Sequence, residues 1–205
     1  MKKLKIVILT IALAAGFSTA CTDSKTSQDM NGNNTLETLK TRRSVRYYQD
    51  RLPEKELLDK ILEAGTYAPT GKNNQSPIIV AVTNKETRDK LSKLNAQVMG
   101  SDNDPFYGAP VVLVVLADRS FAGTYIYDGA LVMGNLMNAA HAVGLGSCWI
   151  HRAKEVFDSP EGKELLKEWG IEGDYEGIGN CIVGYIDGAA PEAKPRKDNY
   201  IYWVE

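Results

Sequence analysis

The feature that most constrains this chain is an uninterrupted apolar run at residues 111–117, with the sequence VVLVVLA. Most of its side chains are β-branched valines, which favour strands. A strand with one solvated face alternates apolar and polar residues, whereas this run offers water no polar face. We therefore expect a central strand that is buried on both faces. The rest of the chain must then supply apolar layers above and below it.

Apolar periodicity predicts the elements that build those layers. Helical spacing and capping residues predict helices at 53–68, at 83–98 behind a Thr83/Glu86 capping box, at 128–143, and behind Ser159 and Pro160 toward Trp169. Short β-branched or aromatic runs predict further strands at 78–82, 147–150, 178–186 and 200–204. The small residues of the helix at 128–143 suit close helix packing, including packing at a subunit interface.

The first 20 residues do not fit this domain. Residues 1–5 carry three lysines, and residues 6–17 form an apolar run that is too short to span a bilayer. This is the pattern of a signal peptide. Ser18, Thr19 and Ala20 precede Cys21, as in a bacterial lipoprotein signal whose cysteine is lipidated. We expect a signal peptide at 1–20, a polar tether at 21–34 and one domain at 35–205.

Two localisations follow from this N-terminus. The first is an exported, membrane-anchored lipoprotein with its lipid at Cys21, and the alternative is a soluble periplasmic or secreted protein after cleavage near Ala20. The chain has 24 basic and 26 acidic side chains, and loss of residues 1–20 would remove three lysines. An acidic domain would be held at a membrane by the lipid rather than by charge. The same balance argues against nucleic-acid binding, which usually needs a basic excess.

Common catalytic motifs are missing. The chain has no Gly-x-Gly-x-x-Gly after a first strand, no Gly-x-Ser-x-Gly, no His-Glu-x-x-His and no Walker loop. Cys148 and Cys181 are not spaced as metal ligands, and we expect no metal site. Cys148 could pair with His141 or His151 as a nucleophile, but small buried cysteines in strands and a core His141 are the favoured interpretation.

Four segments remain that could bind an anion or a heterocycle. Residues 41–46 (TRRSVR) and 194–197 (KPRK) carry guanidinium and ammonium groups that suit a phosphate. Residues 68–75 (APTGKNNQ) offer side-chain amides, which can both donate to and accept from a heterocyclic edge. Residues 144–151 (GLGSCWIH) predict a tight turn that leads directly into a strand. Each segment alone is weak evidence, and for residues 41–46 taken alone a solvated basic turn is the favoured interpretation.

Together, in this order and spacing, the segments resemble the FMN-dependent nitroreductase family from about Leu36 to Val204. Gly108, Ala109 and Pro110 before the central run fit as well, as does Gly184-Tyr185. The resemblance implies an α+β fold, a three-layer αβα sandwich around a mostly antiparallel sheet. It also implies an intertwined homodimer with FMN at the dimer interface.

The resemblance also assigns roles by position. Arg42, Ser44, Lys194 and Arg196 would hold the FMN phosphate, with Arg43 either joining them or facing a partner residue. Arg46 would reach the pyrimidine edge of the flavin, where a cation favours the reduced, anionic form. Thr70, Asn73 and Gln75 would contact the ring or the ribityl chain, partly across the interface. The backbone around Trp149, Ile150 and His151 would line the N5 and O4 side of the ring.

The chain also departs from the family pattern. Many relatives carry an aromatic residue near the position of Ile78, where this chain reads Gln75-Ser76-Pro77-Ile78. The segment that often forms a substrate lid is short here, at about 100–107. Phe106 and Tyr107 are its candidates for stacking on a planar substrate, with core or hinge packing as the alternative.

The resemblance implies an FMN-dependent oxidoreductase in which the flavin carries the chemistry. Electrons would come from NAD(P)H, or from another donor outside the cytoplasm, and would pass to small planar acceptors such as nitroaromatics or quinones. One open ring face would impose ping-pong turnover. Two alternatives stay open: other flavin chemistry, such as reductive dehalogenation or flavin breakdown, and a non-catalytic, surface-anchored flavin-binding protein.

Overall fold

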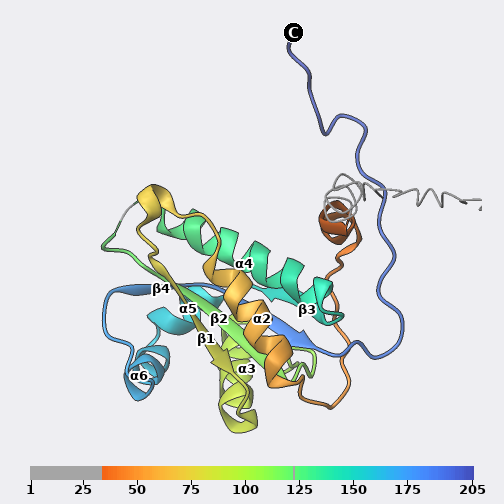
Figure 1. The fold of residues 1–205 in the computed structure, drawn as a ribbon. Helices are drawn as coiled ribbons and strands as arrows, with labels where there is room; N and C mark the ends of the chain where they lie inside the picture. The colour runs from red at the N-terminus through yellow and green to blue at the C-terminus, as the bar shows by residue number, and fades with distance from the viewer. Residues whose placement is uncertain (1–33, 122) are drawn as a thin grey trace, which may run out of the picture. The chain divides into compact units, whose positions relative to one another are not determined.

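The computed structural model describes residues 34–121 and 123–205. The chain divides into two compact units, Met1–Thr35 and Leu36–Glu205, and the second holds every element labelled in Figure 1. The expected signal peptide, Cys21 and nearly all of the expected tether lie outside the described residues. A short helix covers residues 34–41.

No helix in the described residues is both long enough and apolar enough to cross a membrane.

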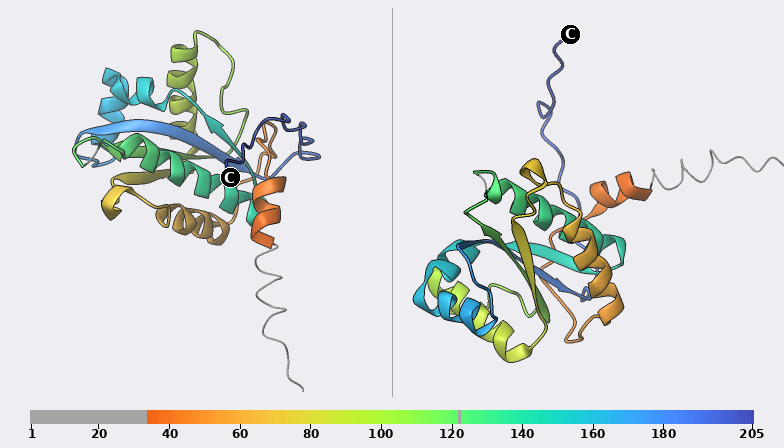
Figure 2. Two further views of the ribbon diagram at one scale, coloured as in Figure 1. Left: turned by 90° about the horizontal axis from the view of Figure 1, so that it is seen from above. Right: turned by 60° about the vertical axis from the view of Figure 1, so that its left-hand side comes forward.

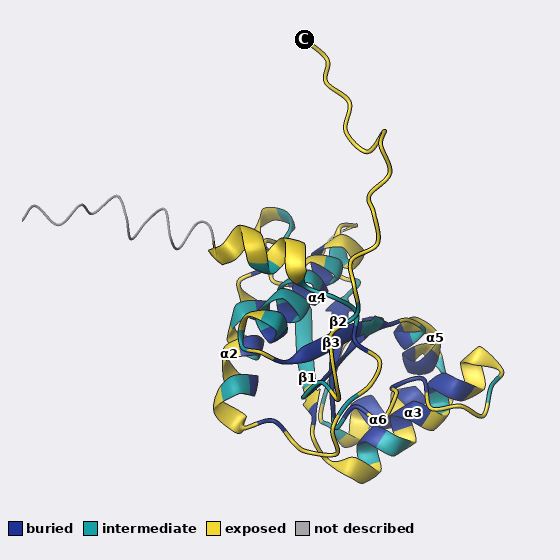
Figure 3. Ribbon diagram, turned by 90° about the vertical axis from the view of Figure 1, so that its right-hand side faces the viewer, coloured by how far each residue is buried: buried dark blue, intermediate teal, exposed yellow. Residues whose placement is uncertain are grey.

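A four-stranded sheet forms the centre of the larger unit, with the order β1-β2-β4-β3 and antiparallel pairing throughout. Its strands are β1 (Pro77–Val82), β2 (Val111–Asp118), β3 (Gly146–Ile150) and β4 (Tyr175–Gly184). Every residue from 111 to 117 is 0% exposed, so β2 is buried on both faces as the sequence predicts. Burial continues along β4, its neighbour, and both strands are dark blue in Figure 3.

Two helical layers cover the sheet. Odd-numbered residues of β2, such as Val111 and Val115, face a core shared with α2 (Lys55–Thr66) and α4 (Tyr125–Ala142). Even-numbered residues of β2 face a second core with α3 (Lys85–Met99), α5 (Ala153–Asp158) and α6 (Pro160–Glu168). Figures 1 and 2 show these two layers on opposite faces of the sheet. The expected three-layer α+β architecture is therefore confirmed.

Several predicted boundaries were wrong at the ends of elements. Asn84 rather than Thr83 caps α3, because its side-chain oxygen accepts the N–H of Thr87 at 2.9 Å. Helix α4 begins at Tyr125 rather than 128, and β4 spans Tyr175–Gly184 rather than 178–186. The short helix α5 was missed because six residues carry too little periodicity to be recognised.

The expected strand at 200–204 is not formed. Residues 192–205 are exposed and contain no helix or strand (yellow in Figure 3). Tyr200, Ile201, Tyr202, Trp203 and Val204 are between 68% and 97% exposed. A strand needs a neighbour to satisfy its backbone hydrogen bonds, and these residues have none within the described part of this chain.

A bulge in β4 brings α5 close to the sheet. The register shifts between Val115, which faces Gly179, and Leu116, which faces Gly177. At Gly177 an added Cβ would lie 2.3 Å from the carbonyl oxygen of Ala153, the first residue of α5. Backbone atoms cannot move aside as a flexible side chain can. Glycine is therefore required where α5 meets the bulge.

We expect Gly177→Ala to lower the free energy of unfolding by ~1–3 kcal/mol, the usual cost of forcing extra atoms into a packed site. Gly123→Ala is the control, because a Cβ there meets nothing within 4 Å and its effect should stay within ~0.5 kcal/mol. Urea unfolding of both variants measures the difference. Equal stabilities would contradict the close approach.

Candidate functional site

A cavity of about 640 Å³ brings together segments that are far apart in the sequence. It is lined by Arg46, by residues of the 99–107 segment, and by Trp149, Ile150, His151 and Arg152. Five of the residues singled out from the sequence therefore meet in one place: Arg46, Tyr107, Trp149, Ile150 and His151. The volume lies within the range of small-molecule and cofactor sites.

Arg46 and Tyr107 lie close together at the wall of this cavity. The guanidinium carbon of Arg46 lies 5.8 Å from the centroid of the Tyr107 ring, within the range of a cation–π contact. Tyr107 is 44% exposed, so part of this residue remains accessible. Phe106 is 0% exposed and lies in the second core beneath the guanidinium of Arg88. Of the two roles left open for Phe106, the structure supports core packing, because burial removes its ring from the cavity.

A partly buried ion-pair network holds the 104–108 loop that carries Tyr107. The Asp104 carboxylate accepts hydrogen bonds from Arg88 and Ser92 of α3, both at 2.5 Å. It also accepts the backbone N–H groups of Phe106 and Gly108. Burial raises the pKa of Asp104, but the bonds from Ser92, Arg88 and the two amides outweigh burial and hold this pKa below its usual value. The loop is therefore anchored by a charged carboxylate at neutral pH.

The basic segment at 42–46 runs beside β3. Ser44 forms a parallel bridge with Ser147, and the N–H of Val45 donates to the Ser147 carbonyl at 2.9 Å. Among the described residues, Arg42 Nη1 and Arg43 Nε are buried and have no hydrogen-bond partner. A buried guanidinium N–H without an acceptor is costly, and it suits an anionic ligand that supplies one.

His141, at the end of α4, lies next to this basic segment. Its Nε2 is 2.8 Å from the hydroxyl of Thr41. Burial lowers the pKa of His141, and the nearby charges of Arg42 and Arg43 lower it further. The ring is therefore neutral at pH 7. His141 is hydrogen-bonded, but it is only partly buried and lies outside both cores, so the favoured core position is not borne out. Cys148 and Cys181 are free and buried, as expected.

Lys194 and Arg196 do not join the basic segment within this chain. Both are exposed residues of the C-terminal tail, and neither makes a hydrogen bond or an ion pair with any residue in the described ranges. The expected convergence of the two basic clusters on one phosphate is therefore not seen in the single chain.

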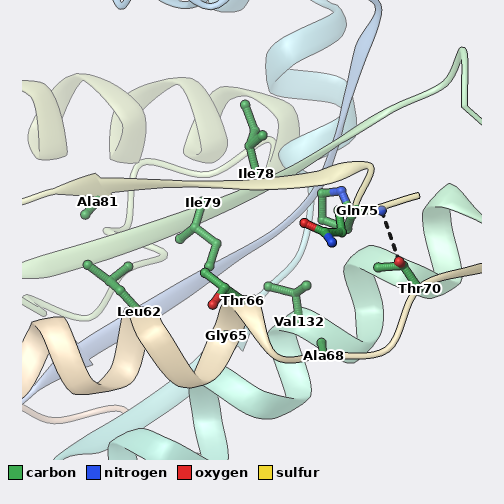
Figure 4. Close-up of a pocket in the computed structure, with 11 residues that line it drawn as sticks. Leu62, Gly65, Thr66, Ala68, Thr70, Gln75, Ile78, Ile79, Ala81 and Val132 are labelled. Carbon is green, nitrogen blue, oxygen red and sulfur yellow. Dashed lines mark hydrogen bonds between the residues drawn. The ribbon is translucent and has the colours of Figure 1, made fainter. Parts of the chain in front are cut away.

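The amide-bearing loop at 70–76 lies at a different cavity. Thr70 and Gln75 line an apolar pocket of about 400 Å³ between α2, β1 and α4, and Asn73 neighbours them in the loop. In Figure 4 the Gln75 N–H donates to the Thr70 hydroxyl at one end of this pocket, at 3.0 Å. Lys72, Asn73 and Gln75 all have φ between 52° and 56°, a left-handed conformation that is rare outside glycine. The loop is strained and must be held by its surroundings.

Asp128 holds the 70–76 loop in this conformation, a role that the sequence analysis did not predict. It is 3% exposed in the first turn of α4, where the helix dipole favours a carboxylate. It accepts the N–H of Gly71 at 3.0 Å and the hydroxyls of Ser76 and Thr124 at 3.4 and 3.3 Å. One side chain thus fastens both ends of the strained loop. No local pattern marks it, because its partners in the loop lie 52 and 57 residues earlier.

We expect Asp128→Ala to cost ~1–3 kcal/mol of unfolding free energy, because three donors lose their buried acceptor. Hydrogen exchange at the Gly71 amide should accelerate more than exchange in β2. Asp59→Ala is the control, since Asp59 makes an exposed pair with Lys55 on α2 and its loss should cost no more than ~0.5 kcal/mol. Unchanged exchange at Gly71 would contradict the anchoring role.

Known proteins share both the sequence and the fold. The model of the nitroreductase family matches residues 39–102 and 97–185. A Methanothermobacter thermautotrophicus protein, provisionally named an NADH dehydrogenase/NAD(P)H nitroreductase, is 36% identical over 118 residues. That match covers 56% of this chain and 59% of the relative, less than two thirds of its length.

Two crystal structures of nitroreductases with bound FMN are similar over nearly their whole length. The Bacteroides fragilis protein is 30% identical with a TM-score of 0.77, and the match covers 83% of this chain and 98% of that one. The Desulfitobacterium hafniense protein is 27% identical with a TM-score of 0.75, covering 84% and 99%. The family match extends over most of the chain, and this protein therefore belongs to the nitroreductase family.

Proposed function

We propose that this protein is an FMN-dependent oxidoreductase that passes electrons from NAD(P)H to small planar acceptors such as nitroaromatics or quinones. The observation that carries the proposal is the pair of buried guanidinium nitrogens, Arg42 Nη1 and Arg43 Nε, that have no protein acceptor among the described residues. Two solved relatives contain FMN. A phosphate would supply the missing acceptors, because arginine forks match its oxygens.

The cavity beyond this segment suits the rest of the cofactor. Arg46 presents a cation at its wall, and Trp149, Ile150 and His151 at the end of β3 line the same cavity. When bound, FMN supplies the electron-transfer chemistry that no side-chain constellation of this chain provides. The task of the protein is to bind and orient the cofactor and to place Arg46 where negative charge gathers on reduction.

We extend the proposal to a homodimer, because one chain does not assemble all the expected ligands. Thr70 and Gln75 line the 400 Å³ pocket beside α2, whereas Arg46 lines the 640 Å³ cavity at the end of β3. A second copy would bring its own 70–76 loop to the first copy's flavin. Two exposed apolar surfaces are available for the contact: Ile126, Tyr127 and Leu131 on α4, and the aromatic tail at 200–204. Twofold dimers are the most common symmetric assembly.

The localisation belongs to the proposal as well. The basic, apolar and small residues before Cys21 support export and attachment through a lipid. An exported enzyme would have little access to cytosolic NAD(P)H, so a direct comparison of electron donors is needed to identify the one that it uses in the cell.

The cofactor assignment predicts that the domain from Thr35 binds FMN without a covalent bond. Replacing Arg42 and Arg43 together by alanine should weaken binding at least ~100-fold, because both carry a buried guanidinium nitrogen without a protein acceptor and each charge-assisted contact contributes ~1.5–3 kcal/mol. Quenching of FMN fluorescence by the apoprotein measures the dissociation constant. Arg51→Ala is the control, because Arg51 is an exposed arginine paired with Glu54. A wild-type protein that takes up no FMN would disprove the assignment.

The reaction assignment predicts ping-pong kinetics, because donor and acceptor would use the same face of the site in turn. Initial rates with NADH, NADPH or dithionite, at several fixed concentrations of menadione or a nitroaromatic, should give parallel double-reciprocal lines. Arg46→Ala should keep most of its FMN yet be reduced at least ~10-fold more slowly, with a lower flavin potential. Intersecting lines would mean that donor and acceptor bind together, and would exclude this mechanism.

A further inference from the structure

The turn that follows β3 is held by a buried asparagine from another layer of the fold. Asn95 of α3 is 0% exposed. Its side-chain N–H donates to the carbonyl oxygen of His151 at 2.8 Å, and its side-chain oxygen accepts Arg152 Nε at 3.0 Å. The side-chain amide of Asn95 therefore binds two consecutive residues of the cavity wall, one through its N–H and one through its oxygen.

This turn needs such a hold. Arg152 has φ 73° and ψ 12°, the left-handed conformation, which is unfavourable for a residue with a Cβ. The preceding carbonyl, that of Ile150, is 3.5 Å from the side-chain amide of buried Asn180. Strained backbone at a cavity wall persists only where surrounding contacts determine it. Asn95 makes the strongest of these contacts.

The hold on His151 also fixes the direction of the next N–H group. A trans peptide is planar, with its C=O and N–H on opposite edges. Because the His151 carbonyl points to Asn95, the N–H of Arg152 points to the other side of the turn. This N–H donates to no residue in the described ranges. Its direction is fixed by the turn, and it is available as a donor to a ligand.

Asn95 belongs to a polar stripe on the buried side of α3. Arg88, Ser92 and Asn95 recur at helical spacing and are 9%, 6% and 0% exposed. Arg88 and Ser92 bind Asp104, which anchors the loop of Tyr107. Asn95 binds the turn at 151–152 on the other wall. A single helix thus holds two walls of the same cavity.

We infer that Asn95 is a positioning residue of the flavin site: it fixes the His151–Arg152 turn so that the Arg152 N–H donates to the cofactor. The inference rests on the proposed FMN binding. A donor in this position stabilises the negative charge that reduction places on a flavin. Asn95 therefore sets both the affinity for FMN and its reduction potential without touching it.

Two variants separate this role from simple support of the fold. Asn95→Asp has nearly the same shape and keeps the acceptor for Arg152, but it loses the donor to His151. Asn95→Ala loses both. Asn84→Ala is the matched control, because it removes a hydrogen bond from the same helix at its exposed N-cap. For each, we would measure the FMN dissociation constant of the apoprotein, the flavin midpoint potential and the melting temperature.

Both Asn95 variants should bind FMN at least ~10-fold more weakly and shift the potential to more negative values. Asn84→Ala should lower the melting temperature while leaving affinity and potential at wild-type values. If the Asn95 variants lose only melting temperature, Asn95 is structural and the inference is wrong. If the wild-type protein itself binds no FMN, the proposed function fails first, and that result is visible before any variant is compared.

Discussion

The rest of the structure depends on one strand that cannot face water on either side. Burial of β2 on both faces requires two apolar layers. Helices α2 and α4 provide one layer, and α3, α5 and α6 provide the other. The remaining places for polar chemistry are the ends of the sheet and the loops around it. The cavity with Arg46 occupies such a place, where β3 ends and the 99–107 segment returns to β2. The position of the site thus follows from the burial of β2, which leaves the ends of the sheet for polar groups.

Buried polar side chains connect that core to the site. A buried polar group that lacks a partner is costly, so each one is tied to a specific atom elsewhere. Asp128 ties α4 to the loop at 70–76, and the polar stripe of α3 ties the 104–108 loop and the 151–152 turn. Each of these anchored segments contains a left-handed residue with a side chain. Strain at the surface is therefore balanced by hydrogen bonds inside, which is how a small domain can hold a site rigid.

Sequence reasoning found what periodicity and order encode. The burial of β2 on both faces and the longer helices of both layers follow from apolar spacing, and the meeting of Arg46 with Trp149 and His151 follows from motif order. It missed α5, which is too short to show a period, and it assigned a strand to an exposed tail that has no neighbour in the described part of the chain.

The anchoring roles of Asp128 and Asn95 could not be recognised from the sequence for another reason. Their partners in the loop and the turn lie more than 50 residues away, and no local pattern distinguishes a buried anchor from a solvated polar side chain.

The separation of the expected ligands into two cavities has a thermodynamic consequence under the proposed dimer. If the cofactor contacts Arg46 of one copy and the 70–76 loop of the other, it binds the dimer more tightly than the monomer. Linkage then requires that FMN strengthen the dimer by the same factor by which dimerisation strengthens FMN binding. The exposed apolar residues of α4 and the tail would not need to hold the copies together alone. The strained loop held by Asp128 would be preorganised for the other subunit's cofactor, so its rigidity would serve an interface as well as the fold of its own chain.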